Sequence, residues 1–167
     1  APSALSENTW YWWRAQADDW FITGPWSAAS SFFVNTANDA PTTPVILSPV
    51  NNAVIPALTA EIRVQNSADP DSTAVSYFFE ADTVPTFDSA GILRSGIVPA
   101  GDETTSWQAT ILSDNTQYYI RAKASDGSAE SAWSAAVTVF VNTANDPPTT
   151  PVIDNPSNGS GVSVFSP

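Results

Sequence analysis

Alternation of apolar and polar residues dominates the chain, and no segment carries a sustained helical period. Apolar side chains occupy every second position in four stretches, which predicts four strands that each turn one face inward. The predicted inward residues are Leu58, Ala60, Ile62 and Val64; Val75, Tyr77, Phe79 and Ala81; Tyr118, Ile120, Ala122 and Ala124; and Val137, Val139 and Val141.

Clusters of Asn, Asp, Ser, Gly and Pro separate these stretches, as between the strands of an antiparallel sandwich. They read SPVNN, NSADPDS, SDN and SDGSAES. A unit of about 107 residues with roughly seven such strands predicts an all-β fold of the immunoglobulin-like sandwich class.

An internal repeat runs through the sequence. Residues 33–46 read FVNTANDAPTTPVI and residues 140–153 read FVNTANDPPTTPVI, identical at 13 of 14 positions and 107 residues apart. The same offset aligns residues 5–46 with residues 112–153, where 26 of 42 positions match. The loop is therefore copied more faithfully than the strands, which indicates a recent duplication or a task that belongs to the loop.

The offset predicts three parts in the chain. Residues 1–39 are the C-terminal part of a first repeat (strands F and G), residues 40–146 are a complete repeat, and residues 147–167 supply the N-terminal strands of a third. On this division both ends fall inside repeats, so we expect the sequence to be a segment of a longer tandem array.

Composition narrows the classes of function. Five basic residues against seventeen acidic ones give a net charge of −12, which argues against nucleic acid and against anionic membrane surfaces. The longest apolar runs are too short for membrane insertion. Because the chain has neither Cys nor His, disulfides, thiolate metal sites and the commonest nucleophile–base pairs are excluded.

Catalysis by such a chain would rest on carboxylates alone. Glu80 and Asp82 lie two apart on one predicted strand and share a face, but a sandwich exterior offers no cleft in which two carboxylates could act on one substrate. We therefore expect both to be solvated charges and the protein not to be an enzyme.

Spacing along the third predicted turn and strand resembles a known family. Leu112, Tyr118 and Arg121 are spaced as at the end of strand E and along strand F of a fibronectin type III domain, and Leu5, Tyr11 and Arg14 repeat the pattern. The resemblance implies tyrosine corners, in which the hydroxyls of Tyr11 and Tyr118 bond back to the preceding loop.

Two Trp-Ser pairs extend that resemblance. They begin at Trp26 and Trp133, and they are similar to half of the Trp-Ser-x-Trp-Ser element of cytokine-receptor domains, in which Trp and Arg side chains stack. The resemblance therefore implies that Arg14 lies over Trp26 and Arg121 over Trp133. The usual Trp of strand B is missing, and we expect Trp107 to fill its core volume.

Acidic and amide residues are expected to gather at one pole of the complete sandwich. There the linker meets the B–C and F–G loops, which brings together Asn38, Asp39, Asp69, Asp71 and Asp126. The arrangement resembles the interdomain calcium sites of cadherins, and Ca²⁺ takes six to eight oxygen ligands. The alternative is a metal-free joint, with no cofactor, stiffened by the prolines of the linkers: Pro41, Pro44, Pro147, Pro148 and Pro151.

Exposed aromatic residues concentrate in the first copy. Trp10, Trp12 and Trp20 could stack on sugar rings of surface glycans or contact a neighbouring domain. The complete repeat has other residues at the matching positions (Gln117, Tyr119 and Gly127), which favours a contact with a neighbouring domain or chain.

These features favour a structural repeat of an extracellular filament, stalk or adhesin, secreted or on a bacterial surface. The pairing of the ADPDST loop with the VNTANDAP linker resembles tandem repeats of large bacterial surface proteins. Its partners would be neighbouring repeats or copies of itself, joined covalently or by strand complementation between subunits. The alternative is a spacer or carbohydrate-binding array of a secreted polysaccharide-degrading enzyme.

Overall fold

The computed structural model describes residues 4–71, 74–155, 157–161 and 163. Among these residues no helix forms, and therefore none that could cross a membrane. The described elements are β1 (Thr9–Trp13), β2 (Ser30–Val34), β3 (Val45–Ser48), β4 (Ala53–Ile55), β5 (Thr59–Gln65), β6 (Ser76–Asp82), β7 (Leu93–Arg94), β8 (Val98–Pro99), β9 (Thr104–Thr110), β10 (Thr116–Ser125) and β11 (Val137–Val141).

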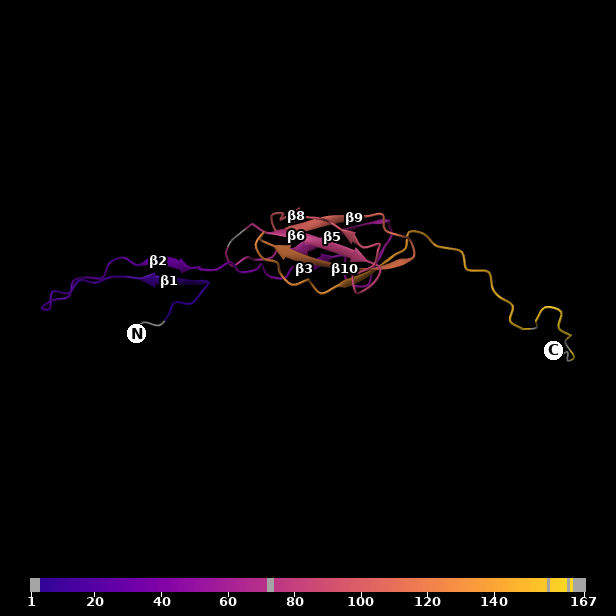
Figure 1. Ribbon diagram of the computed structural model, residues 1–167, viewed down its shortest axis with the longest axis horizontal. Helices are drawn as coiled ribbons and strands as arrows, with labels where there is room; N and C mark the ends of the chain where they lie inside the picture. The colour runs from indigo at the N-terminus through magenta and orange to yellow at the C-terminus, as the bar shows by residue number, and fades with distance from the viewer. Residues whose placement is uncertain (1–3, 72–73, 156, 162, 164–167) are drawn as a thin grey trace.

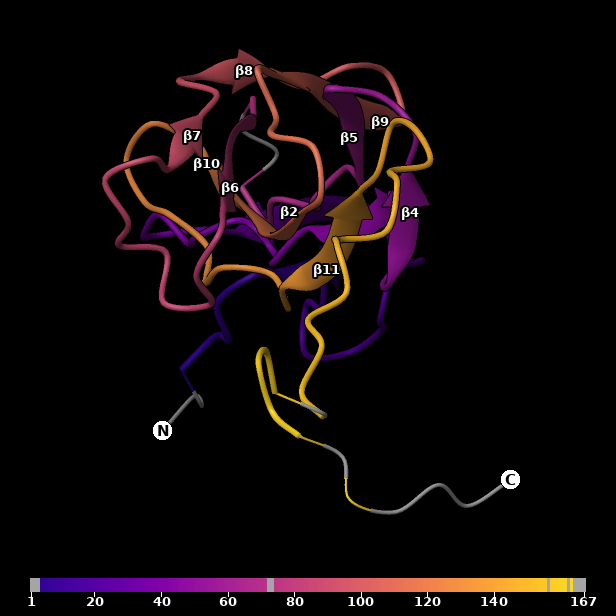
Figure 2. The ribbon, with the colours of Figure 1, turned by 90° about the vertical axis from the view of Figure 1, so that its right-hand side faces the viewer.

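Nine of these strands build a two-layer sandwich. One sheet has the order β3-β5-β9, and the other has the order β4-β11-β10-β6-β7, with β8 also paired to β6. All pairs are antiparallel except β4 with β11. Figure 2 views this arrangement along the long axis of the molecule. The predicted fold class, an immunoglobulin-like sandwich of fibronectin type III type, is confirmed.

The alternating residues form the core between the two sheets. Ile62 and Val64 of β5 face Tyr77 and Phe79 of β6 and Ile120 of β10, and all five are at most 1% exposed. Burial on this scale is the main favourable term in the folding of a small domain. The outlier among the predicted inward residues is Leu58, which precedes β5 and is 48% exposed, because alternation alone does not fix where a strand begins.

Trp107 takes the place of the missing strand-B tryptophan. It lies on β9 directly opposite Ile62, half-buried against the core, with its ring 6.1 Å from that of Phe79. Because β5 and β9 are neighbours in one sheet, a large side chain on either strand can fill the same volume.

Two segments extend from the sandwich, one on each side (Figure 1). The hairpin β1–β2 lies beyond one pole, and the described residues after 146 run outward from the other without forming a strand. In the sandwich, strand A (β3) forms against β5, and these later residues have no such partner among those described. The division into repeats at residues 39 and 146 stays a prediction.

Truncating the core should destabilise the sandwich strongly. Phe79→Ala removes a buried ring that contacts both sheets, so we expect a loss of about 3–5 kcal/mol in the free energy of unfolding. Urea unfolding followed by circular dichroism measures it. Val54→Ala is the matched control, because Val54 is 62% exposed and should cost well under about 1 kcal/mol.

Candidate functional site: the hydrogen-bonded joint

The joint is the linker 35–39, which leads from β2 toward β3 and connects the hairpin to the sandwich. Its sequence, Asn-Thr-Ala-Asn-Asp, belongs to the stretch that the chain repeats almost without change. Such a segment has little apolar surface to bury, so its position depends on polar contacts.

On the hairpin side, two side chains of the loop before β1 hold the linker. The Glu7 carboxylate accepts hydrogen bonds from the backbone N–H and the hydroxyl of Thr36, and a longer one (3.3 Å) from the N–H of Ala37. The Asn8 amide donates to the Asp39 carboxylate at 2.7 Å. These contacts orient the linker with respect to the hairpin.

On the sandwich side, two carboxylates hold the same five residues. Asp71 accepts from the Asn35 amide with one oxygen and from the backbone N–H of Asp39 with the other, both at 2.7 Å. Asp126, from the F–G loop, accepts from the Asn38 amide at 2.9 Å. Because both oxygens of Asp71 are used, its carboxylate is fixed in direction as well as in position.

The loops that carry these carboxylates are themselves ordered by local hydrogen bonds. Asp69 accepts from the N–H of Asp71 at 2.7 Å, which closes a turn of the kind that Asx residues favour. The second oxygen of Asp126 accepts from the N–H groups of Ser128 and Ala129, both at 2.6 Å. These local hydrogen bonds therefore fix the positions of the Asp71 and Asp126 carboxylates independently of their contacts with the linker.

The second copy of the linker shows the same contacts on its hairpin side. Asp114, which matches Glu7 in the repeat, accepts from the N–H of Thr143 at 2.8 Å. Asn115 donates to Asp146 at 2.8 Å, as Asn8 does to Asp39. In both copies, therefore, an acidic residue followed by Asn, just before strand F, binds the Thr and the Asp of the linker.

Three of these carboxyl groups are shifted toward the charged form. The side-chain hydrogen bond from Thr36 lowers the pKa of Glu7, and the backbone N–H of Thr143 lowers the pKa of Asp114. The N–H of Ala129, followed by the amide of Asn38, lowers the pKa of Asp126. Each shift has the same cause, because hydrogen bonds donated to a carboxylate favour its ionised state.

The predicted linker site is brought together by the structure, with a different division of roles. Asn38, Asp39, Asp71 and Asp126 meet directly, and Asp69 orients Asp71. Among the described residues no group of three acidic side chains is close enough to hold a metal ion. In the structure, the Asp39, Asp71 and Asp126 carboxylates each accept a hydrogen bond from an N–H group. Calcium binding stays a prediction from the sequence.

Sequence reasoning missed half of the joint. Glu7, Asn8, Asn35 and Thr36 were not singled out, although all four positions are identical or acidic in both copies. Their repetition was the available signal. What the sequence could not supply is the path of the loop before strand F, which reaches across to the linker.

A ladder of stacked side chains crosses the outer face of β6 and β10. The Arg121 guanidinium lies 4.2 Å from the ring centre of Trp133 and 4.0 Å from that of Phe87, and the Lys123 ammonium lies 5.1 Å from Trp133. In the hairpin, Arg14 lies 4.2 Å over Trp26. Both Arg–Trp pairs are present, as the resemblance implied. Such cation–π contacts contribute on the order of 0.5–1 kcal/mol to stability at exposed sites.

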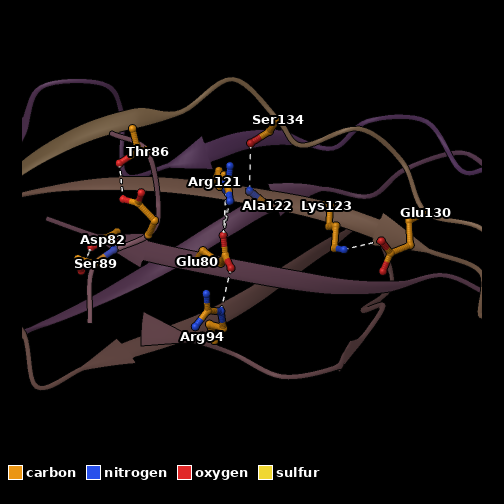
Figure 3. Close-up of polar contacts among 11 residues, drawn as sticks. Glu80, Asp82, Thr86, Ser89, Arg94, Arg121, Ala122, Lys123, Glu130 and Ser134 are labelled. Carbon is orange, nitrogen blue, oxygen red and sulfur yellow. Dashed lines mark hydrogen bonds and ion pairs between the residues drawn. The ribbon is translucent and has the colours of Figure 1, made fainter. Parts of the chain in front are cut away.

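Glu80 and Asp82 are not the solvated charges that we expected. Glu80 is 8% exposed and accepts from Arg121 at 2.7 Å and from Arg94 at 2.9 Å, while Asp82 is fully buried and bonds the N–H and hydroxyl of Ser89 (Figure 3). Burial raises the pKa of Asp82, and the hydrogen bonds from Ser89 outweigh it, so the net shift is downward. The segment after β6 folds over this edge of the face, which alternation does not predict.

Both tyrosine corners are present. The Tyr118 hydroxyl accepts from the N–H of Ser113 at 3.0 Å, and the Tyr11 hydroxyl accepts from the N–H of Ser6 at 2.7 Å. Tyr118 is 5% exposed in the core, whereas Tyr11 is half-buried. The corner therefore forms in the hairpin even though no sandwich surrounds it among the described residues.

The three tryptophans of the proposed sugar platform are exposed, at 55% for Trp10, 70% for Trp12 and 97% for Trp20. Trp10 and Trp12 share one face of β1, and the ring of Trp10 packs against Phe33 at 5.3 Å. Trp20 stands apart from them, in the loop between the strands. Glycan binding by these residues stays a prediction.

Several solved structures are similar to the chain. The chain is similar to the FN1–FN3 domains of chicken CNTN1, with 15% identity and a TM-score of 0.45, over 83% of this chain and 45% of that one. It is also similar to an Fn3-like protein from Clostridium thermocellum, with 18% identity and a TM-score of 0.39, over 66% of this chain and 100% of that one. The third structure is described as a myokine (13% identity, TM-score 0.42, covering 64% and 99% of the two chains).

No protein-family model and no curated protein sequence matches the chain. The chain spans less than half the length of the chicken structure. At these identities the similarities concern the fold alone.

Removing the Asp71 carboxylate should free the joint. Asp71→Ala deletes the acceptor of two linker hydrogen bonds, so the hairpin should sample a wider range of orientations while the sandwich stays folded. Because the chain has no Cys, spin labels at Ser31→Cys and Glu61→Cys report one distance across the joint. We expect a narrow distance distribution in the parent chain and a broad one in the variant.

Asp88→Ala is the matched control, since Asp88 is an exposed carboxylate whose partner among the described residues is Thr86 of its own loop. It should leave the distance distribution unchanged. Equal distance distributions in the parent chain and in Asp71→Ala would contradict the claim that Asp71 holds the linker. A distribution that narrows only when Ca²⁺ is added would mean that the joint requires a metal ion.

Acid should also release the joint, since protonation removes the charge and one acceptor oxygen of a carboxylate, and Glu7 and Asp126 each use both oxygens. The pKa values of Glu7 and Asp126 lie below their ordinary values of 4.5 and 3.8. Both carboxylates therefore accept their linker hydrogen bonds fully at a pH above these ordinary values, and they lose these bonds as the pH falls through the lowered pKa values. The same spin-label distance should therefore stay sharp down to about pH 4 and broaden below it. The double variant Glu7→Gln, Asp126→Asn should weaken this dependence without abolishing it, because the Asp71 carboxylate is retained. Broadening of the parent distribution already above about pH 5 would count against the assignment.

Proposed function

We propose that the chain is a structural link of an extracellular filament, stalk or adhesin, built from tandem fibronectin type III-like repeats. The observation that carries the proposal is the joint, in which the linker 35–39 is held from both sides by side chains of the hairpin and of the sandwich. A linker meant only to tether two domains needs no such contacts.

The shape of the molecule supports the same function. The hairpin and the sandwich follow one another along the long axis of the molecule, and the described residues after 146 leave the sandwich at its opposite end (Figure 1). The second linker repeats the hairpin-side contacts at Thr143 and Asp146, so a further repeat would continue the axis with the same geometry. The net charge of −12 disfavours lateral association of such rods through electrostatic repulsion.

A carbohydrate-binding or spacer array of a secreted enzyme is the second candidate. Exposure of Trp10 and Trp12 on one face of β1 favours it, because aromatic rings of this kind can stack on sugars. Binding of the full chain on a glycan array, lost in Trp12→Ala, would support it.

Electron microscopy of the secreted protein tests the structural function. We expect thin rods or fibres with an axial repeat of one or two domains, straight in the parent and visibly more bent in Asp71→Ala. Compact monomers of parent protein that cleave a polysaccharide would contradict the proposal. Asp88→Ala again serves as the matched control, since it leaves the joint intact.

A further inference from the structure

The two copies of the linker stretch differ at a single position, and that difference changes the chemistry of one peptide bond. Residues 33–46 and 140–153 match everywhere except at residue 40, which is Ala, and residue 147, which is Pro. The bond after the linker aspartate is therefore Asp39–Ala40 in the first copy and Asp146–Pro147 in the second. A proline nitrogen carries two alkyl carbons besides the acyl carbon, so in acid it leaves more readily than an ordinary peptide nitrogen.

The Asp146 side chain supplies a nucleophile beside this bond. A carboxylate oxygen of an aspartate can reach the main-chain carbonyl carbon of its own residue by closing a five-membered ring. Asn115 donates to Oδ2 of Asp146 at 2.8 Å, and among the described residues no hydrogen bond reaches Oδ1. The other carboxylate of that loop, Asp114, is occupied by the N–H of Thr143. Within the described part of the chain Asp146 takes part in no ion pair, so Oδ1 is available for attack.

Water also reaches the Asp146–Pro147 bond, since both residues are exposed. The first linker shows that this exposure persists next to a folded sandwich. There Asp39 is half-buried, but Ala40, which matches Pro147, is exposed. The position of the bond in the linker therefore leaves it accessible to solvent.

The other Asp-Pro bond of the chain, Asp69–Pro70 in the B–C loop, has different surroundings. Oδ1 of Asp69 accepts from the N–H of Asp71 at 2.7 Å, and Oδ2 is buried. The N–H of Thr42 binds the carbonyl of the preceding Ala68 at 2.8 Å, which holds the backbone of the loop. While the sandwich is folded, this carboxylate is therefore fixed in its turn and screened from water.

We propose that the chain cleaves itself in acid at the Asp146–Pro147 bond. An oxygen of the Asp146 carboxylate attacks the main-chain carbonyl carbon of the same residue, and the C–N bond to Pro147 breaks. The leaving nitrogen takes a proton from solvent. Water then opens the cyclic anhydride, which restores the side-chain carboxyl group and leaves a new C-terminal carboxyl group on residue 146. The sum consumes one water and changes no oxidation state, so no other reactant is required.

This activity goes beyond the proposed structural function and does not depend on it. In a tandem array it would cut a joint that carries Asp-Pro and spare a joint that carries Asp-Ala. The identity of one linker residue would therefore decide where a rod comes apart in acid.

Incubation of the full chain at roughly pH 3, where protons for the leaving nitrogen are abundant, tests the proposal. If circular dichroism shows unfolding, the lowest pH at which the sandwich stays folded is used instead. Mass spectrometry should find two fragments, residues 1–146 and residues 147–167, the second beginning with Pro147. Cleavage at Asp69–Pro70 should be at least about tenfold slower in the folded chain, and the rates at the two bonds should converge in urea.

Variants separate the nucleophile from the leaving group. Pro147→Ala, which gives the second linker the residue of the first, should slow cleavage at least about tenfold. Asp146→Glu should do the same, because its longer side chain must close a six-membered ring. Pro148→Ala is the matched control, since it leaves the Asp146–Pro147 bond in place, and the rate should not change.

A gain of cleavage completes the test. Ala40→Pro should create a second cleavage site in the first linker and release residues 1–39. Among the described residues the N–H of Ala40 donates no hydrogen bond, so proline removes no contact there.

Three outcomes would overturn the proposal. The first is a folded chain that stays intact over the time in which the urea-unfolded chain is cut. The second is equal cleavage at Asp69–Pro70 and Asp146–Pro147 in the folded state. The third is an unchanged rate in Pro147→Ala or in Asp146→Glu, because the bond would then be cut without the proposed leaving group or nucleophile.

Discussion

The Asp71 carboxylate, shared between the Asn35 amide and the Asp39 N–H, is the contact on which the extended form of the molecule depends. Neighbouring domains in one chain move independently unless something larger than a tether holds them. Here the linker is too polar to be buried, so directional hydrogen bonds to charged groups take the place of a hydrophobic interface. Glu7 and Asn8 hold the linker from the other side, so the hairpin and the sandwich are each fixed to the linker rather than to each other.

Much of the sandwich could be predicted because its rules are local. Alternation identifies the inward face of β5, β6, β10 and β11, and the Tyr and Arg-Trp spacings fix two further contacts on strands F and G. The joint was predicted only as a place where Asn38, Asp39, Asp71 and Asp126 gather, since topology determines which loops meet. Which group donates to which depends on loop paths, as does the burial of Glu80 and Asp82, and no sequence period encodes a loop path.

Comparison of the two hairpins separates local from tertiary effects. Register, tyrosine corner and Arg–Trp stacking are the same in β1–β2 as in the F–G hairpin of the sandwich. Strand length and burial are not. β10 is longer than β1 because β6 supplies a partner, and Ile120 is buried where Trp13 is exposed because two sheets close over it. The residue at which a strand ends therefore depends on the neighbouring strands as well as on the β-propensity of the sequence.

The fidelity of the copied loop follows from the same distinction. A core position requires only an apolar group of suitable volume, so Trp13 and Ile120 can replace each other in sequence. The linker residues each have a specific donor or acceptor to satisfy, and Asp39 satisfies two, one through its carboxylate and one through its N–H. A substitution there would leave a carboxylate or an amide on another segment without its partner. The loop is therefore more constrained than the strands, because it must match two structural units at once.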